Sequence, residues 1–236
     1  MELHENFYFL LTPILVLVTY LSAFKNGKPT CDRFITNYFL YLLTSFFISF
    51  SSHKMIDKGI ITTKKQYKWP LFILLLVLIF LIIKVKNQFL QHVIYLLILL
   101  ILSYLNKIFL EKLDRKQIES ILKKMIIIIL VCMAIALKYP KLITNSLLNA
   151  LIFGLISVLI LGFIDHVFFN KKYKSYLDLI TVFLFAGFIM YDTNRVVIES
   201  KRCKQGGKNP NYIDLVFNML LNLDGIFKNL AELELA

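Results

Sequence analysis

Asp192 is the residue of this sequence best placed for chemistry, because it ends an apolar stretch of membrane length. It lies in FLFAGFIMYDTNRVVIES, residues 183–200, between Tyr191 and Thr193. An ionised aspartate in hydrocarbon costs about 2.5–3.5 kcal/mol on insertion scales, so such a residue usually faces protein, water or an ion path. From position alone, the simpler interpretation is an interfacial carboxylate that pairs with a nearby Lys or Arg.

A polar series in the last apolar segment adds a partner for that carboxylate. Asp214, Asn218 and Asn222 recur at every fourth position of NPNYIDLVFNMLLNLDGIFKNLAEL, residues 209–233, and Gly225 follows about one turn later. Side chains with this spacing share one face of a helix. Such a face needs a polar partner or a water-filled cavity if the helix lies in a membrane.

Charged residues elsewhere form helical i,i+4 series that predict solvated faces. Asp224 points away from the Asn222 face and continues with Lys228 and Glu232. The stretch EKLDRKQIESILKK, residues 111–124, carries the same spacing in Glu111–Arg115 and Glu119–Lys123. We expect a solvated helical extension there, although a partner-binding segment is the alternative.

Other reactive side chains are scattered. The three cysteines, Cys31, Cys132 and Cys203, are odd in number and lack C-x-x-C spacing, so the sequence predicts neither a disulfide framework nor a zinc site. The histidines show no paired metal-ligand spacing, and no H-E-x-x-H or G-x-S-x-G motif occurs. Near helix ends we expect interfacial roles for Asp165, His166 and Asp178. We therefore expect no enzymatic activity.

The elements that must position these residues are membrane helices. Hydrophobic residues make up 58% of the 236 positions, more than a soluble domain can cover. The apolar runs have the length of a membrane-crossing helix, and the alternation of a membrane β-barrel is absent. We predict an all-α, polytopic bundle of seven to eight transmembrane helices with a semi-polar C-terminal helix, at about residues 7–24, 34–52, 69–86, 88–109, 123–138, 145–169, 176–194 and 211–231.

The basic charge is spread over the connections between these helices. The chain carries 27 Lys and Arg against 15 Asp and Glu, a net charge of +12. Because no basic stripe forms, we assign this charge to lipid headgroups and topology and expect no nucleic-acid partner. The two sides of the membrane receive similar numbers of basic residues, so the positive-inside rule leaves the orientation open. The acidic N-terminus lacks a cleavage site, and we expect 7–24 to be a retained helix.

The helices form one transmembrane domain over 1–236 in this interpretation, since no linker divides the chain. In the sixth segment, Ala150, Gly154 and Gly162 are small residues that would let another helix approach closely.

A family resemblance rests on the last three apolar segments. LDLITVFLFAGFIMYDTNRVV, with Phe-Ala-Gly before Tyr-Asp-Thr, resembles the sixth helix of the Bax-inhibitor-motif (TMBIM) membrane proteins. PNYIDLVFNMLLNLDGIF resembles, without gaps, the closing helix of that family, and 145–169 resembles the helix before the motif. The resemblance covers about 145–230. It implies seven helices, six around a less apolar C-terminal one, with a TMBIM-like core at about 34–231 and 7–24 as an added helix.

The resemblance also implies a gate and a cargo. Family members are described as calcium-leak channels and cell-death modulators whose gate is a pair of aspartates. The first maps to Asp192, flanked by the motif residues Tyr191 and Thr193, and the second maps to Asn222. Two carboxylates in one site share a proton and sense pH, whereas an Asp–Asn pair does not. We therefore expect altered gating, weaker calcium binding at Asp192, and an ion path lined by Asp192, Asn222, Asp214 and Asn218.

Two functions follow from these observations. The first is a calcium-permeable leak channel, or modulator of cell death and ion homeostasis, with a modified aspartate gate. Its expected location is the endoplasmic reticulum or Golgi, with the mitochondrial inner membrane as the alternative. The second is a non-conducting structural or accessory subunit of a larger membrane complex, mitochondrial or viral for example, on a TMBIM-derived scaffold. Beyond a calcium ion, we expect no cofactor.

Overall fold

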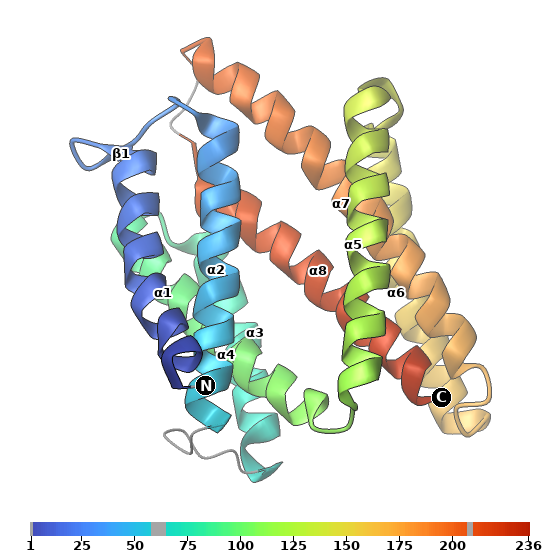
Figure 1. Cartoon of the computed structure of the whole chain (residues 1–236). Helices are drawn as coiled ribbons and strands as arrows, with labels where there is room; N and C mark the ends of the chain where they lie inside the picture. The colour runs from blue at the N-terminus through green and yellow to red at the C-terminus, as the bar shows by residue number, and fades with distance from the viewer. Residues whose placement is uncertain (1, 58–64, 207–209) are drawn as a thin grey trace. The chain divides into compact units, whose positions relative to one another are not determined.

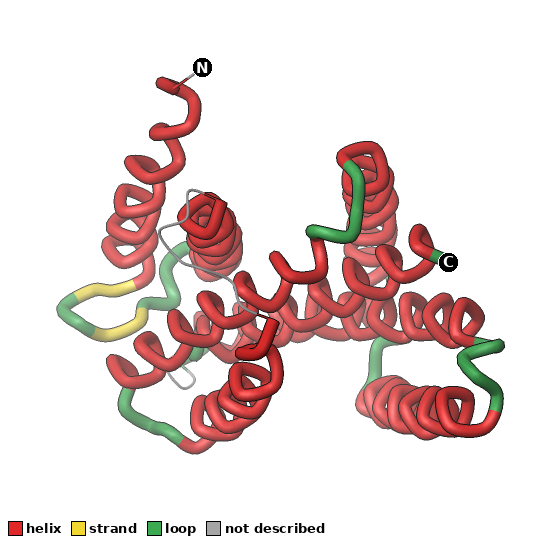
Figure 2. The backbone as a smooth tube through the Cα atoms, turned by 90° about the horizontal axis from the view of Figure 1, so that it is seen from below, coloured by secondary structure: helices red, strands yellow, loops and turns green. Residues whose placement is uncertain are grey.

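The chain folds almost wholly into helices. The computed structural model describes residues 2–57, 65–206 and 210–236, with side chains described for 11–56, 66–107, 110–206 and 210–236. The side chain of His4 lies outside these ranges. Within the described residues there are eight α-helices and one short strand pair (Figure 2). They group into two compact units, 1–112 with 200–217, and 113–199 with 218–236.

The first unit is built on the N-terminal helices (Figure 1). It holds α1 (Glu2–Ala23), the strands β1 (Phe24–Lys25) and β2 (Lys28–Pro29), α2 (Phe34–Asp57), α3 (Lys68–Lys84) and α4 (Gln88–Leu110). A 3-10 turn, η1 (Lys65–Tyr67), precedes α3. Helix α1 packs on α2, and both α2 and α3 pack on α4.

Hydroxyl groups join the helices of the first unit in their apolar surroundings. The Oγ1 atoms of Thr19 in α1 and Thr44 in α2 lie 2.7 Å apart, and Ser45 Oγ lies 2.6 Å from the Tyr95 hydroxyl of α4. All four side chains are buried. Hydrogen bonds between them satisfy groups that would otherwise be costly to bury.

The second unit contains the helices that carry the candidate site. They are α5 (Arg115–Lys138), α6 (Asn145–Phe168), α7 (Lys174–Lys204) as far as Glu199, and α8 (Tyr212–Leu235) from Asn218. A 3-10 turn, η2 (Pro140–Leu142), joins α5 to α6. At the start of α5, Asp114 forms a capping box with Gln117, which satisfies backbone donors of the first turn.

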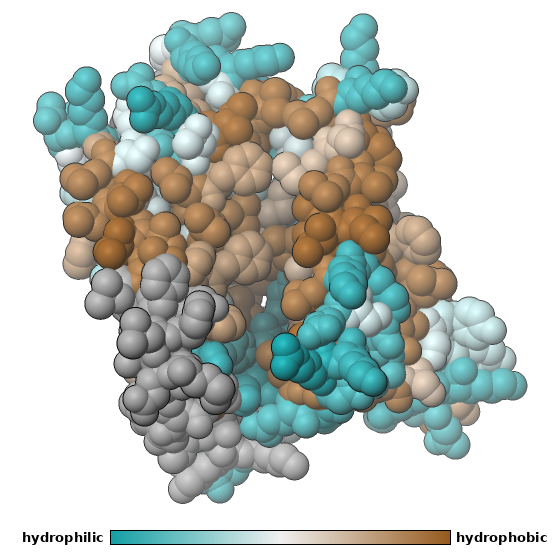
Figure 3. Space-filling view, viewed as in Figure 1, coloured by the Kyte–Doolittle hydropathy of each residue, from teal (hydrophilic) through white to brown (hydrophobic). Residues whose placement is uncertain are grey.

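Among the residues that the structure describes, five helices are long and apolar enough to cross a membrane, which is consistent with an integral membrane protein. They are α2, α4, α5, α6 and α7. Figure 3 shows apolar side chains gathered along the helices and hydrophilic ones near their ends, a distribution that suits a bilayer. Of the remaining three, α3 has 17 residues, the described apolar part of α1 is Leu11–Ala23, and α8 is more polar.

The predicted segments recur as helices, with differences of extent at several of their ends. Helix α7 continues to Lys204, ten residues beyond the expected end at 194. The charged stretch 111–124 is interrupted, because α4 ends at Leu110 and α5 begins at Arg115. Glu111 therefore does not share a helix with Arg115, whose Nε instead lies 3.1 Å from Glu119 Oε1.

The expectation that no disulfide forms was wrong. Cys31, in the connection from β2 to α2, is bonded to Cys203 near the end of α7, with their Cα atoms 5.5 Å apart. The two cysteines are 172 positions apart, so sequence spacing could not indicate their contact. Cys132 is a free, buried thiol.

Candidate functional site

The centre of the candidate site is a hydrogen bond between α7 and α8 within the second unit. Asn222 Nδ2 donates to Asp192 Oδ2 at 2.7 Å. Both side chains are buried, 8% and 7% exposed respectively. The carboxylate thus receives a neutral amide donor at the position where the resemblance implies a second acid.

Glycines bring the helices around this pair close together. Gly225 of α8 comes three residues after Asn222, and a Cβ atom there would lie 2.5 Å from the Phe185 ring of α7. A Cβ at Gly187 of α7 would lie 2.5 Å from a methyl of Leu151 in α6. Small residues that allow close backbone approach are characteristic of membrane helix packing. Gly187 and Gly225 therefore allow close packing about one turn away from the Asp192–Asn222 contact.

The small residues predicted on α6 have different environments. At Gly154 a Cβ would lie 2.8 Å from Leu184 of α7, so this glycine does permit a close approach. The same expectation for Gly162 was wrong, because nothing lies within 4 Å of a Cβ there, and Ala150 is exposed. The faces differ because positions eight residues apart on a helix are about 80° apart in direction.

The neighbours of Asp192 in the motif serve the helix framework. The Thr193 hydroxyl donates to the backbone oxygen of Ile189 one turn earlier, at 2.8 Å. Tyr191 is half-buried, and its hydroxyl makes a long contact of 3.4 Å with Asn145 Oδ1 at the start of α6. Asn194 Nδ2 donates to the Ile143 carbonyl at 3.2 Å, which ties α7 to the α5–α6 connection. These residues position Asp192 and leave it as the charged member of the motif.

The polar series on α8 is divided between environments. Asp214 and Asn218 are half-buried, Asp214 belongs to the residues grouped with the first unit, and Asn222 is the member of the series whose amide donates to Asp192. Asp224 forms the predicted pair with Lys228, Nζ to Oδ2 at 2.6 Å. Glu232 pairs with Lys174 of α7. Asp224 is therefore paired within its own helix, as its i,i+4 spacing predicted.

The site does not form a ready calcium cage. Among the described residues, no group of three or more His, Cys, Asp or Glu side chains is arranged to hold a metal ion. Calcium sites usually take six to eight oxygen ligands with several carboxylates. At this site Asp192 offers one carboxylate, and the Asn222 group facing it is an N–H donor. This donor set is smaller than the ligand shell of a resident calcium ion.

The C-terminal end of α8 is anchored by contacts that the sequence analysis missed. Glu234 accepts hydrogen bonds from Ser120 Oγ at 2.9 Å and Lys124 Nζ at 2.5 Å, both on α5, and Gln117 Nε2 donates to its backbone oxygen at 3.2 Å. The Lys124 hydrogen bond holds the pKa of the Glu234 carboxyl below its usual range. The i,i+3 and i,i+4 polar spacing of Gln117, Ser120 and Lys124 was the available signal.

Residues near Asp165 complete the second unit. The buried carboxylate of Asp165 accepts a hydrogen bond from the Tyr173 backbone N–H at 3.0 Å. The Asp165 backbone oxygen accepts from the backbone N–H groups of Phe169 and Lys171. Asp165 thus closes the turn between α6 and α7, in keeping with a structural role near a helix end.

Comparison with known proteins adds no family assignment. No protein-family model matches this chain, and no curated protein matches it. The functional argument therefore depends on the geometry of the chain itself.

Proposed function

We propose that this protein is an integral membrane protein that lets a cation, calcium in the first instance, cross an intracellular membrane along a path controlled by Asp192 and Asn222. The buried hydrogen bond between these side chains carries the proposal. A carboxylate kept in an apolar helix usually faces protein, water or an ion path, and here one of its partners is the Asn222 amide of the adjacent helix. The proposal includes the TMBIM relationship, which rests on the motif residues alone.

Asn222 determines how such a path would be controlled. An amide N–H stabilises the ionised carboxylate by donating a hydrogen bond, and the amide does not itself titrate. A pair of acids at the same distance would hold one proton between them and release it as pH rises. The Asp–Asn pair would thus conduct with little dependence on pH, and a passing Ca²⁺ would meet one charged ligand.

The proposed membrane domain comprises seven or eight helices. To the five longest apolar helices we add α3 and α1, with α8 enclosed among them as the semi-polar helix. No residue of α8 between Tyr212 and Glu234 is exposed, although this stretch carries eight charged or amide side chains, which are usually exposed in proteins. The endoplasmic reticulum or Golgi membrane is the proposed location, with the mitochondrial inner membrane as the alternative.

Calcium flux into liposomes that carry the purified full chain tests this function. The experiment compares pH 6 with pH 8 for the unmodified protein, Asp192→Asn and Asn222→Asp. We expect similar flux of the unmodified protein at both pH values and a loss of at least tenfold in Asp192→Asn. Asn222→Asp should introduce lower flux at pH 6 than at pH 8, because the acid pair then retains its proton.

Asp224→Asn is the matched control, because it removes a carboxylate of α8 that is paired with Lys228 away from the site. It should leave the flux unchanged. Flux that is absent from the unmodified protein and is not restored in Asn222→Asp would reject the channel.

The second candidate is a non-conducting subunit of a larger membrane assembly. The exposure of α6 favours this second candidate. Only 6% of the most apolar stretch of α6 is buried within the chain, against 44% for α2. Lipid or a partner chain must cover that face. Gentle detergent extraction followed by measurement of the particle mass distinguishes the two candidates, because a subunit would leave the membrane in a particle well above 27.6 kDa of protein.

A further inference from the structure

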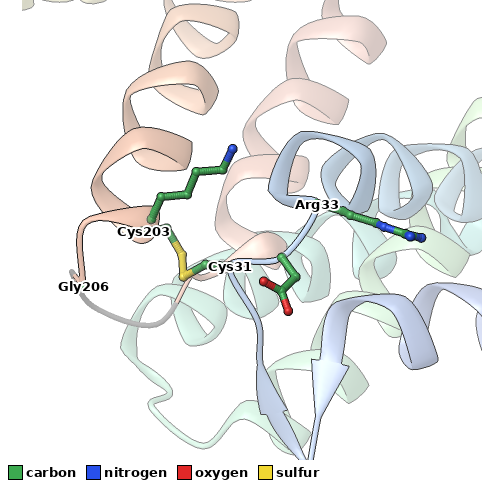
Figure 4. A pocket seen from close by; sticks show the side chains of 6 residues that line it. Cys31, Arg33, Cys203 and Gly206 are labelled. Carbon is green, nitrogen blue, oxygen red and sulfur yellow. A yellow bond between two sulfur atoms is a disulfide. The ribbon is translucent and has the colours of Figure 1, made fainter.

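The Cys31–Cys203 disulfide lies between two connections of the first unit that are far apart in sequence. Cys31 belongs to the segment between β2 and α2, and Cys203 belongs to the last turn of α7. The disulfide lines an open pocket of about 730 Å³ together with the charged residues Asp32, Arg33 and Lys204. Figure 4 shows the bonded sulfurs, with the Arg33 side chain directed away from them. Cys31 is half-buried, so this sulfur is accessible from the pocket.

Tyr212 joins the same two connections independently of the disulfide. At the start of α8, its hydroxyl donates to the Thr30 carbonyl at 2.6 Å and accepts from Asn37 Nδ2 at 3.2 Å. Its ring stacks on Tyr41 of α2 with the centroids 5.5 Å apart. Tyr212 is 3% exposed. The α7–α8 connection is therefore attached to the α1–α2 connection by both covalent and noncovalent contacts.

This attachment restricts how many helices can cross the membrane between residues 31 and 203. Two points that touch must lie on the same side of the bilayer, so the chain between them crosses an even number of times. All five of the long apolar helices, α2, α4, α5, α6 and α7, lie between the two cysteines. Five crossings would place Cys31 and Cys203 on opposite sides. An even number is reached if one further helix crosses, or if one of the five does not.

Helix α3 is the remaining α-helix of the described residues between the two cysteines, and its composition suits a span. Its 17 residues are KWPLFILLLVLIFLIIK, with charge confined to Lys68 and Lys84 at the ends. At a rise of about 1.5 Å per residue it is about 26 Å long, near the lower limit for a crossing. Trp69 is 70% exposed beside Lys68, an arrangement typical of an interfacial anchor.

We propose that Cys31 and Cys203 form a disulfide on the oxidising side of the membrane and that α3 crosses the bilayer as the sixth span between them. Disulfides persist in lumenal, extracellular and periplasmic compartments and are rare where thiols are kept reduced. The connections that follow α1, α3, α5 and α7 then share that side. The inference requires membrane insertion and no ion flux, so it is independent of the proposed channel.

Counting thiols tests the disulfide in the unmodified full chain. Membranes are treated with N-ethylmaleimide at lysis, denatured, and tagged with a polyethylene-glycol maleimide after reduction by dithiothreitol. Dithiothreitol attacks one sulfur, releases the other as a thiolate, and cyclises to its own disulfide, so two electrons pass from reagent to protein. We expect two tags in the unmodified protein and in Cys132→Ser, and none in Cys203→Ser. No tag in the unmodified protein would show that the disulfide does not form.

Single-cysteine labelling tests the crossing of α3. In a full-length chain with Cys31, Cys132 and Cys203 replaced by Ser, Lys28→Cys and Lys86→Cys are exposed in sealed vesicles to a membrane-impermeant maleimide. We expect both to react from the same face, because α2 and α3 lie between them. Lys172→Cys, in the α6–α7 connection, should react from the other face. Reaction of Lys28→Cys and Lys86→Cys from opposite faces would show that α3 does not cross.

The two measurements overturn different parts of the proposal. Thiol counting in the unmodified chain does not depend on whether a variant without cysteines folds. Labelling reports the number of crossings whether or not the disulfide forms. Two tags together with same-face labelling is the result that the proposal requires.

Discussion

Asn222 is the residue at which this chain departs most clearly from a shared-proton gate. The Asn222 Nδ2 atom lies 2.7 Å from Asp192 Oδ2, and both side chains are buried. If Asn222 is replaced by Asp, two carboxylates must occupy that distance. They can do so at acidic pH, where one proton bridges them, and they repel each other once both ionise.

We therefore predict that Asn222→Asp destabilises the folded protein more at pH 8 than at pH 5. The loss at pH 8 should be about 1.5–3 kcal/mol, the usual contribution of a hydrogen bond to a charged group. This corresponds to a fall in Tm of about 3–12 °C for a chain of this size. Thermal unfolding in detergent measures it. Asn218→Asp, at a half-buried position one turn earlier, is the control and should show a smaller pH dependence.

Tyr212 allows a second prediction at the level of single residues. Its hydroxyl donates to Thr30 and accepts from Asn37. Tyr212→Phe keeps the ring stacked on Tyr41 and leaves the half-buried Thr30 carbonyl and the buried Asn37 amide without that partner, so we expect a loss of about 1–3 kcal/mol. Chemical unfolding monitored by fluorescence would measure it. Tyr176→Phe, at a residue that is 70% exposed, should change stability by less than about 0.5 kcal/mol.

At the level of helices, packing around the candidate site depends on glycine. Gly225→Ala places a methyl group 2.5–2.7 Å from three ring atoms of Phe185. The ring or α8 must move, and overpacking of this kind costs about 1–3 kcal/mol. Gly162→Ala is the matched control, because nothing lies within 4 Å of its Cβ position, and it should be neutral or stabilising. Equal effects of the two substitutions on Tm would contradict the packing described here.

The C-terminal end of α8 should respond to acid. The hydrogen bond from Lys124 lowers the pKa of Glu234. The contact therefore stabilises the fold fully above the usual carboxyl pKa, and this stabilisation disappears as the pH falls through the lowered pKa. We expect faster hydrogen exchange of the last turn of α8 at acidic pH, below the usual range of carboxyl titration. Glu234→Gln should show similarly fast exchange already at pH 7. Glu119→Gln, which breaks an exposed pair within α5, should not change exchange in α8.

The same helices show what could be predicted from sequence. Hydrophobic length located the eight segments, and i,i+4 spacing placed Asn222 on a polar face and paired Asp224 with Lys228, because both signals are local to one helix. Contacts between helices were not accessible in this way. The pairing of Glu234 with α5 and the open environment of Gly162 depend on how neighbouring helices are rotated. Spacing within one helix does not determine that rotation.

Across the whole molecule, the main error concerned Cys31 and Cys203, and its cause is sequence distance. With six helices between them, no local pattern signals their proximity. The five candidate spans also obscure this contact, because an odd number of crossings would put Cys31 and Cys203 on opposite sides of the membrane. Once this contact is known, the parity of crossings supports the proposal that α3 also crosses the membrane.

The disulfide should also contribute to the stability of the whole chain. It closes a loop of 172 positions, for which the chain-entropy model gives about 5 kcal/mol at 25 °C. Helices held in detergent keep part of the unfolded chain ordered, so a loss of about 2–4 kcal/mol is expected when the bond is removed. We predict that Cys203→Ser lowers Tm by about 4–16 °C. Dithiothreitol should lower the Tm of the unmodified protein by the same amount and leave that of Cys203→Ser unchanged, whereas Cys132→Ser should retain the full response to the reductant. A Tm of the unmodified protein that is insensitive to reduction, despite a thiol count showing that the bond has opened, would mean that Tyr212 and its neighbours hold the two connections together without it.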